Sequence, residues 1–257
     1  HAKAYVMATG AAEKFLAFEN NDLPGITGAG AVQTLMNLYG VLPGKEVVMV
    51  GSGNIGLIVS YQLLQAGVSV KAILEAAPNI GGYKVHAAKI ARLGVPILTS
   101  TTVKKAFGTK ELEKIETVSL DENWKEIPGT EKQIFCDTLC IAVGLSPLHQ
   151  LMSMAGIRMK YVNELGGLVP VLDGKRETSM ENVFACGDVS GIEEASSAMA
   201  GGSLAGLYAA NAIGHRHKDF DELTRKYEQE LCELRQGPCG KKIRTGLERL
   251  VDADATE

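Results

Sequence analysis

The sequence predicts an α/β fold with a parallel sheet, and three adjacent features support this prediction. The apolar run Glu46–Val50 is typical of a buried strand and leads directly into the glycine-rich turn Gly51–Gly56. A stretch with helical periodicity follows over Ile55–Ala66. A second apolar run, Val68–Leu74, then ends in the carboxylate of Glu75. Strand, helix and strand in this order indicate a βαβ unit, whose two strands pair in parallel.

The glycine turn has the G-x-G-x-x-G spacing that binds dinucleotides when it joins a strand to a helix. Gly51 allows a tight turn, Gly53 lets the backbone approach a pyrophosphate, and Gly56 lets helix and strand pack closely. Glu75 can accept hydrogen bonds from both ribose hydroxyls and would repel a 2′-phosphate, which favours NAD(H) over NADP(H). The alternative is a glycine turn of a doubly wound fold without a ligand. The turn residues that we expect at an NAD site are Gly51, Ser52, Gly53, Asn54, Ile55 and Gly56.

The composition is ordinary for a soluble enzyme, with 46% hydrophobic and 22% charged residues and a formal net charge of −4. Lysine and arginine are scattered rather than clustered, which argues against a nucleic-acid partner. Every apolar stretch is interrupted before the ~18 residues that a membrane span needs, so we expect no such span. No signal peptide is visible. The chain begins at His1 rather than at methionine, as a tag remnant or the cut end of a longer protein would.

The five cysteines form no C-x-x-C motif. Cys136 and Cys140 lie in the segment Gln133–Gly144, which reads as one strand. They should therefore share a face roughly 13 Å apart, too far for a disulfide, and we expect buried thiols. Cys232 and Cys239 are either ordinary cysteines of the charged C-terminal region or ligands of a metal or iron–sulfur cluster. The odd count and the spacing favour a reducing cytoplasm.

Strand and helix signals continue on both sides of the glycine turn. A helix is predicted over 29–39, and after Glu75 we expect a helix at 83–92 and a strand at 95–99. The strands of an expected antiparallel β-meander are 102–107, 113–120 and 124–136. Residues 148–182 read as a loop-rich region.

A second strand-to-turn motif lies later in the chain. Val183–Cys186 reads as a strand that ends in Gly187-Asp188 and leads into a helix of small residues over about 192–213. A carboxylate beside a helix N-terminus can accept a hydrogen bond from a sugar-like hydroxyl of a flavin, or it can cap the helix. The residues alone leave both interpretations open. The first residues, Ala4–Gly10, read as a short buried strand and a turn.

Three motifs in this order resemble those of the pyridine nucleotide–disulfide oxidoreductase superfamily. They are Ala8-Thr9-Gly10, the glycine turn, and Thr178 followed after six residues by Ala185-Cys-Gly-Asp188. The resemblance covers about residues 1–215. It implies an FAD-binding three-layer domain that is interrupted by a Rossmann-like NAD domain, with Gly144 near the NAD. The FAD-site residues that it implies are Thr9, Gly10, Gly187 and Asp188.

The resemblance also sets expected domain boundaries. The end of the first half of the FAD domain is expected at 1–40, the NAD-binding domain at 41–145 and the second FAD half at 146–215. Residues 216–257 should form a charged helical tail, with a break at Gly237–Gly240. In the superfamily an FAD-binding glycine fingerprint precedes the Ala-Thr-Gly turn. We therefore expect this chain to be a fragment that lacks the first FAD half.

Within the superfamily, the segments Asn21–Thr27, Ile80–Tyr83 and Ile192–Met199 look most like the α subunits of sarcosine-, proline- or opine-type dehydrogenases and oxidases. The resemblance implies an FAD-dependent oxidoreductase that transfers a hydride between NAD(H) and flavin. It also implies a partner subunit in a heteromeric amino-acid dehydrogenase or oxidase. Such a transfer needs no acid or base from the protein, so we assign no catalytic residue and no metal site. The alternative is a non-catalytic subunit that binds a dinucleotide or supports assembly.

Overall fold

The chain folds into two units, each with hydrophobic core clusters of its own. The computed structural model describes residues 1–251, without the side chains of residues 238, 239 and 251. One unit is the continuous stretch Glu13–Gly144, and the other combines His1–Ala12 with the chain from Leu145 onward. The chain passes from one unit to the other at residues 12–13 and 144–145. Strands β2 (Ala11–Glu13) and β11 (Leu145–Pro147) lie at these two positions and pair with each other.

A five-stranded parallel sheet forms the middle of the unit Glu13–Gly144. Its strands run in the order β3–β10–β4–β5–β6, and all neighbours are parallel. Parallel neighbours need long crossover connections, and helices supply most of them. The strands are β3 (Ile26–Gly28), β4 (Glu46–Val50), β5 (Ser69–Leu74), β6 (Ile97–Leu98) and β10 (Thr138–Ile141). The helices are α1 (Ala29–Tyr39), α2 (Asn54–Gln65) and α3 (Lys84–Arg92).

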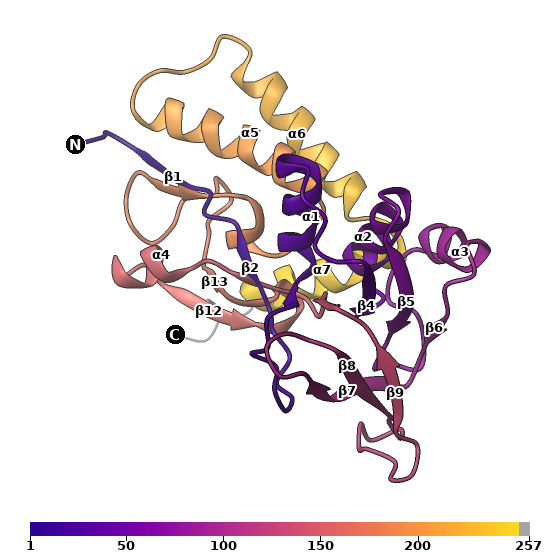
Figure 1. Ribbon diagram of the computed structural model, residues 1–257. Coiled ribbons are helices and arrows are strands. Elements are labelled where there is room, and N and C mark those ends of the chain that lie inside the picture. Colours follow the sequence, from indigo (N-terminus) through magenta and orange to yellow (C-terminus); the bar gives the residue numbers. More distant parts are fainter. Residues whose placement is uncertain (252–257) are drawn as a thin grey trace. The chain divides into compact units, whose positions relative to one another are not determined.

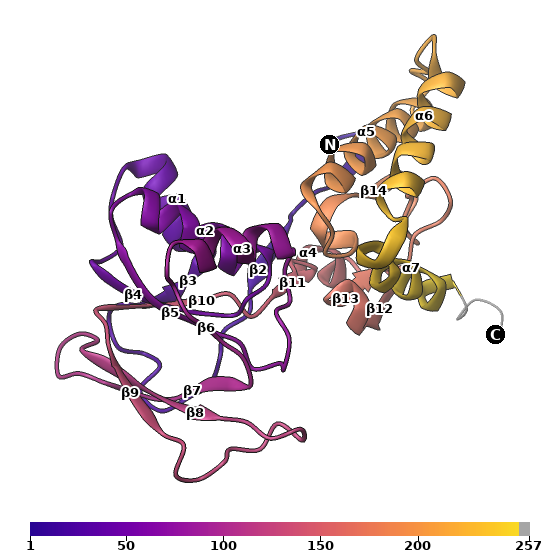
Figure 2. The ribbon, with the colours of Figure 1, turned by 90° about the vertical axis from the view of Figure 1, so that its right-hand side faces the viewer.

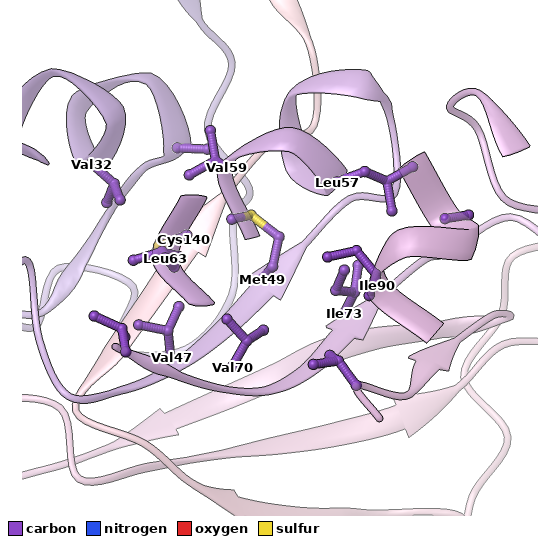
Figure 3. Packing of buried hydrophobic residues seen from close by; sticks show 14 residues of the cluster. Val32, Val47, Met49, Leu57, Val59, Leu63, Val70, Ile73, Ile90 and Cys140 are labelled. Atoms are coloured by element: carbon purple, nitrogen blue, oxygen red, sulfur yellow. The ribbon is translucent and has the colours of Figure 1, made fainter. Parts of the chain in front are cut away.

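Both faces of this sheet are buried, so the unit has three layers (Figure 2). The three helices cover one face, and an antiparallel sheet covers the other. Side chains alternate along a strand, so Val47 and Met49 of β4 pack among residues of the helices (Figure 3), whereas Val48 and Val50 pack among residues of the antiparallel sheet. Burial on both faces explains why β4 reads as a continuous apolar run. The antiparallel strands are β7 (Thr101–Phe107), β8 (Lys114–Ser119) and β9 (Lys132–Phe135).

The N-terminal boundary of this unit lies at Glu13 rather than at the expected residue 41. Residues 13–40 belong with the parallel sheet because β3 pairs with β10 and α1 packs on α2. The Glu13 carboxylate also accepts hydrogen bonds from the backbone N–H groups of Gly30 (2.7 Å) and Ala31 (3.3 Å) at the start of α1. It thereby satisfies donors of a helix whose own N-cap, Gly28, has no side chain.

The segment expected as one strand over 133–144 is two strands in different sheets. β9 pairs with β8, whereas β10 lies between β3 and β4. The chain changes sheets at Asp137, whose carboxylate accepts hydrogen bonds from the N–H groups of Lys45 and Glu46 at the start of β4. Cys136 and Cys140 are both buried, as expected, but they do not share a strand.

The other unit contains a parallel strand pair that joins its two chain segments. β1 (Tyr5–Met7) pairs with β14 (Val183–Ala185). The region 148–182, expected to be loop-rich, instead holds a short helix and an antiparallel strand pair. Its elements are α4 (Gln150–Met154), β12 (Met159–Val162), the 3₁₀ helix η1 (Asn163–Leu165) and β13 (Gly167–Pro170).

The C-terminal helices pack on this unit and do not form a separate tail. α5 (Ala195–Ala212) lies beside α6 (Phe220–Leu234), as Figure 1 shows, and the two helices share a core cluster. α7 (Gly237–Val251) packs on η1. The expected break at Gly237–Gly240 is the first turn of α7, where a proline is tolerated. No helix within residues 1–251 combines the length and apolar character needed to cross a membrane.

Candidate functional site

The glycine turn and Glu75 meet at one edge of the parallel sheet. The N–H of Gly51, which follows β4, donates to the carbonyl of Leu74 at the end of β5 at 2.7 Å. Glu75 is the next residue after β5. Strands β5 and β10 lie on opposite sides of β4, so the strand order reverses beside β4. Ligands of open α/β sheets bind at such a switch point, outside the carboxyl ends of the strands.

The three glycines of the turn have different surroundings. Gly51 has a φ of +102°, and a Cβ added there would overlap the carbonyl of Ala142. A Cβ at Gly56 would overlap the carbonyl of Gly51, because α2 packs directly on the turn. A Cβ at Gly53, in contrast, would meet no atom within 4 Å. Gly51 and Gly56 therefore serve the turn itself, whereas Gly53 borders the open space that a pyrophosphate would need.

Hydrogen bonds from the turn fix the carboxylate of Glu75. Its Oε2 accepts from the backbone N–H (2.9 Å) and from the hydroxyl (2.5 Å) of Ser52, and its Oε1 accepts from the N–H of Ala77 (2.9 Å). An ionised carboxylate has about four lone-pair sites, so acceptor capacity remains for a ligand. The expected ribose acceptor is thus held next to the expected phosphate site.

The segment Ile80–Tyr83 also belongs to this site, although no binding role was expected for it from the sequence. The N–H of Gly82 donates to the carbonyl of Ser52 (2.8 Å), and the N–H of Tyr83 donates to Oδ1 of Asn54 (2.9 Å). A Cβ at Gly82 would lie 2.9 Å from the backbone nitrogen of Asn54. In the sequence, the paired glycines Gly81-Gly82, soon after Glu75, could have indicated this segment, since paired glycines often mark a close approach of the backbone to another group.

The remaining residues expected near NAD lie at the same edge of the sheet. Gly144 follows β10, the neighbour of β4 on the other side of the switch point. It has a φ of +117°, and its carbonyl accepts a hydrogen bond from the N–H of Lys14 at 2.9 Å. Ile55, in the first turn of α2, has an exposed side chain. All the residues expected at an NAD site thus come from this one edge.

A second group of expected residues is brought together by β1 and β14. These strands are parallel neighbours, and the N–H of Cys186 donates to the carbonyl of Met7 at 3.0 Å. Thr9-Gly10 and Gly187-Asp188 therefore follow the carboxyl ends of adjacent strands. This is the edge of a parallel pair at which ligands bind. In the sequence only a family resemblance links these motifs, whereas the strand pairing brings them together directly.

Local hydrogen bonds and burial define the two halves of this second group. The Thr9 hydroxyl donates to the carbonyl of Leu148 at 2.7 Å. Asp188 lies in the 3₁₀ helix η2 (Gly187–Ser190), and the N-cap of the next helix is Glu194. The interpretation of Asp188 as a helix cap is therefore wrong. Burial raises the pKa of Asp188 above its ordinary value, against the lowering effect of a hydrogen bond from the backbone of Glu193.

A charged cluster borders Asp188. The guanidinium of Arg235 donates to both carboxylate oxygens of Glu193, at 2.9 and 2.7 Å, and both side chains are largely buried. Arg176 lies against Gly201 of α5, and burial lowers the pKa of its guanidinium. These three residues line one cavity together with Asp188. They are far apart in the sequence and share no motif, so no local spacing pointed to this cluster.

The cysteines whose side chains the structure describes show no sign of a shared site. Burial raises the pKa of Cys136 and of Cys140 to about 12, so both thiols stay protonated at neutral pH. Cys232 is exposed on α6. The side chain of Cys239, the second expected cluster ligand, lies outside the described residues. Within the described part of the chain, no three His, Cys, Asp or Glu side chains gather as metal ligands.

Known proteins resemble this chain over most of its length. The family model described as "Pyridine nucleotide-disulphide oxidoreductase" matches residues 1–218. The alpha subunit of sarcosine oxidase from Corynebacterium sp. (strain P-1) is 29% identical over 83% of this chain and 21% of its own length. An opine oxidase subunit from Agrobacterium tumefaciens (strain Ach5) is 26% identical over 80% of this chain and 43% of its own length. The chain thus spans less than half the length of these relatives.

Solved structures show the same fold. Thioredoxin reductase from T. acidophilum superposes with a TM-score of 0.67 at 24% identity, covering 83% of this chain and 67% of that one. An FAD-dependent pyridine nucleotide-disulphide oxidoreductase from Desulfovibrio vulgaris gives a TM-score of 0.65 at 20% identity, covering 82% and 54%. An NAD-dependent persulfide reductase from A. fulgidus gives a TM-score of 0.61 at 21% identity, covering 83% of this chain and 40% of that one.

Proposed function

The chain belongs to the family of pyridine nucleotide–disulphide oxidoreductases, and on that premise we propose that it serves FAD-dependent oxidoreduction with NAD(H) as the hydride donor or acceptor. The observation that carries this proposal is the placement of two residue sets. One set lies at the carboxyl ends of parallel strands in the unit Glu13–Gly144, and the other at the carboxyl ends of β1 and β14. Dinucleotides bind at such edges.

In the first set, the chain's own groups would hold NAD(H) at its pyrophosphate and at its adenosine ribose. The N-terminal end of α2 would take the pyrophosphate, because the helix dipole favours an anion there and the backbone N–H groups of the first turn point toward it. The open space in front of Gly53 provides the room. Glu75 would accept a hydrogen bond from the adenosine ribose and exclude a 2′-phosphate by charge repulsion. These assignments favour NAD(H) over NADP(H).

In the second set, Thr9-Gly10 and Gly187-Asp188 would hold a flavin. The proposed role of Asp188 is to accept hydrogen bonds from hydroxyls of the ribityl chain. When both cofactors are bound, they supply the hydride chemistry, which runs between nicotinamide and flavin in either direction. The chain would bind, align and shield them from water, and no side chain is needed as an acid or base.

A titration tests the pyridine nucleotide part of the proposal. The purified chain is titrated with NADH and with NADPH, and binding is followed by the fluorescence of the reduced nicotinamide. We expect tighter binding of NADH, and Glu75→Ala should weaken NADH binding about tenfold while sparing NADPH. The matched control is Glu122→Ala, an exposed carboxylate in the turn between β8 and β9. Equal affinities in the wild type would contradict the preference for NAD(H).

The flavin part needs a separate readout. Added FAD should bind with a shift of its visible spectrum, and Asp188→Ala should weaken that binding. When NADH is added to the chain with FAD bound, it should bleach the flavin absorbance under anaerobic conditions. If NADH and FAD bind but no bleaching follows, the chain is a non-catalytic dinucleotide-binding or assembly subunit instead.

We further propose that the chain acts with partner subunits in an amino-acid dehydrogenase or oxidase. The relatives that support this are named as subunits of sarcosine oxidase and opine oxidase. The free thiols of Cys136, Cys140 and Cys186 suit the proposed cytoplasmic location. Affinity purification of the chain from its native host tests the partner proposal. Recovery of the chain alone, at the mass of a single protomer, would contradict it.

A further inference from the structure

We propose that Ser52 is a positioning residue for cofactor selectivity, which holds Glu75 so that it cannot move away from a 2′-phosphate. The inference rests on the proposed NAD(H) site and adds a second residue to its selectivity. A carboxylate on a flexible side chain discriminates poorly against a phosphate, because it can rotate away and relieve the repulsion. A carboxylate that is fastened in place keeps the repulsion, and unrelieved repulsion is an effective source of specificity.

The hydrogen bonds around Ser52 define the direction of its hydroxyl proton. Ser52 is fully buried. The N–H of Gly81, which can only donate, gives a hydrogen bond to Oγ of Ser52 at 3.0 Å. The Ser52 hydroxyl is therefore free to donate its own proton to Oε2 of Glu75, at 2.5 Å. A hydroxyl with one acceptor bond and one donor bond fixed in this way has little rotational freedom left.

The carboxylate of Glu75 is held from both sides. Oε2 receives two hydrogen bonds from Ser52, and Oε1 receives one from the N–H of Ala77 at 2.9 Å. With its lone pairs on Oε2 taken, Glu75 keeps acceptor capacity mainly on Oε1. A ribose hydroxyl can donate to that oxygen without any rearrangement of the carboxylate. A 2′-phosphate cannot donate, and the three hydrogen bonds prevent Glu75 from withdrawing.

The backbone of the segment Ile80–Tyr83 also binds the glycine turn. The segment is fastened to the glycine turn at Ser52 and Asn54, through the N–H groups of residues 81, 82 and 83. A Cβ at Gly82 would lie 2.8 Å from Cδ1 of Leu57, so only glycine fits this close to α2. The Ser52 side chain binds both this segment and Glu75. Removing its hydroxyl therefore takes away one of the two hydrogen bonds to Oε2 and leaves the N–H of Gly81 without this acceptor.

The test compares dissociation constants for NADH and NADPH in the wild type and in Ser52→Ala. We expect the ratio of the NADPH constant to the NADH constant to fall about tenfold, because a carboxylate held by two hydrogen bonds instead of three can turn away from the 2′-phosphate. The matched control is Ser60→Ala. Ser60 is also fully buried on α2, and its hydroxyl donates to the Gly56 carbonyl at 2.7 Å without reaching Glu75. Its loss should leave the ratio unchanged.

A double-mutant cycle separates positioning from general damage. In the Glu75→Ala background, Ser52→Ala should have no further effect on the ratio, because there is no carboxylate left to position. Ser52→Cys provides a variant of similar volume with a weak donor, and it should give an intermediate ratio even if Ser52→Ala fails to fold.

Each outcome separates the inference from the proposed function. If the wild type binds neither nucleotide, both the proposed function and the inference are wrong. If the wild type prefers NADH and Ser52→Ala retains the full ratio, the proposed function stands and the positioning role of Ser52 is overturned. Equal weakening of NADH and NADPH by Ser52→Ala also overturns it, since that is the effect of a merely structural residue.

Discussion

Alanine at Gly56 and alanine at Gly53 should separate the folding role of the glycine turn from its ligand-binding role. In Gly56→Ala, the added Cβ would overlap the carbonyl oxygen of Gly51 and lie 3.1 Å from its carbonyl carbon, whereas ordinary van der Waals contact begins near 3.4 Å. Both atoms are backbone, so no side chain can rotate to relieve the overlap. Overpacking costs about 1–3 kcal/mol, and an overlap with backbone atoms belongs in the upper part of that range, about 2–3 kcal/mol. Alanine regains about 1 kcal/mol of helix propensity. We expect a net loss of about 1–2 kcal/mol.

Gly53→Ala should have the opposite profile. The residue has φ −64° and ψ 174°, which alanine adopts readily, and its Cβ would meet no protein atom within 4 Å. The free energy of unfolding should therefore change by less than ~1 kcal/mol. The new methyl group would instead stand in the space proposed for the pyrophosphate. We expect the dissociation constant for NADH to rise at least about tenfold.

Thermal unfolding followed by circular dichroism, together with NADH titration, measures both effects. Gly56→Ala should lower Tm by roughly 2–8 °C, given about 2–4 °C per kcal/mol for a chain of this size. An unchanged Tm in Gly56→Ala would refute the close packing of α2 on the turn. NADH binding to Gly53→Ala as tight as in the wild type would refute the approach of the ligand along this face.

Three further predictions concern residues outside the glycine turn. Glu13→Ala should lower the free energy of unfolding in urea by about 1–2 kcal/mol, because α1 loses the carboxylate that caps it, and an unchanged midpoint would contradict that role. Iodoacetamide at pH 8 should label Cys232 and leave Cys136 and Cys140 unlabelled until the chain unfolds, as mass spectrometry of the peptides can show. In the folded chain the pKa of Asp188 is raised above the ordinary value near 3.8. The stability that the protonated carboxyl contributes is therefore complete below the ordinary pKa, and it is lost as pH rises through the raised pKa. The wild type should therefore lose stability relative to Asp188→Asn as pH rises above ~4 in urea unfolding series, and parallel pH profiles would argue against the shift.

The parts of the fold that could be predicted are those with local signals. β4, the glycine turn, α2 and β5 follow one another directly, so hydrophobic periodicity and the glycine spacing define them without tertiary information. The same holds for the strand that ends in Gly187-Asp188. These segments contain most of the candidate residues of both sites, so these residues could be named before the fold was known.

The parts that could not be predicted depend on contacts between distant residues. Asp137 ends one strand because its carboxylate binds the N–H groups at the start of β4, far earlier in the chain. Residues 13–40 join the parallel-sheet unit through the pairing of β3 with β10 and the packing of α1 on α2, and Glu13 caps α1 from seventeen residues before Gly30. The segment Ile80–Tyr83 approaches the turn through backbone N–H groups, which nearly every residue carries. No periodicity or motif records such contacts.

The continuity of the unit Glu13–Gly144 has a consequence for the order of folding. Its two ends are joined by a hydrogen bond from the N–H of Lys14 to the carbonyl of Gly144, so the unit can close on itself. β1, in contrast, is synthesised before this unit but pairs with β14, which follows the unit in the sequence. On the ribosome β1 must therefore wait for this partner until the interrupting unit has emerged and formed. Early closure of that unit shortens the effective loop between the two strands and lowers the entropy cost of joining them.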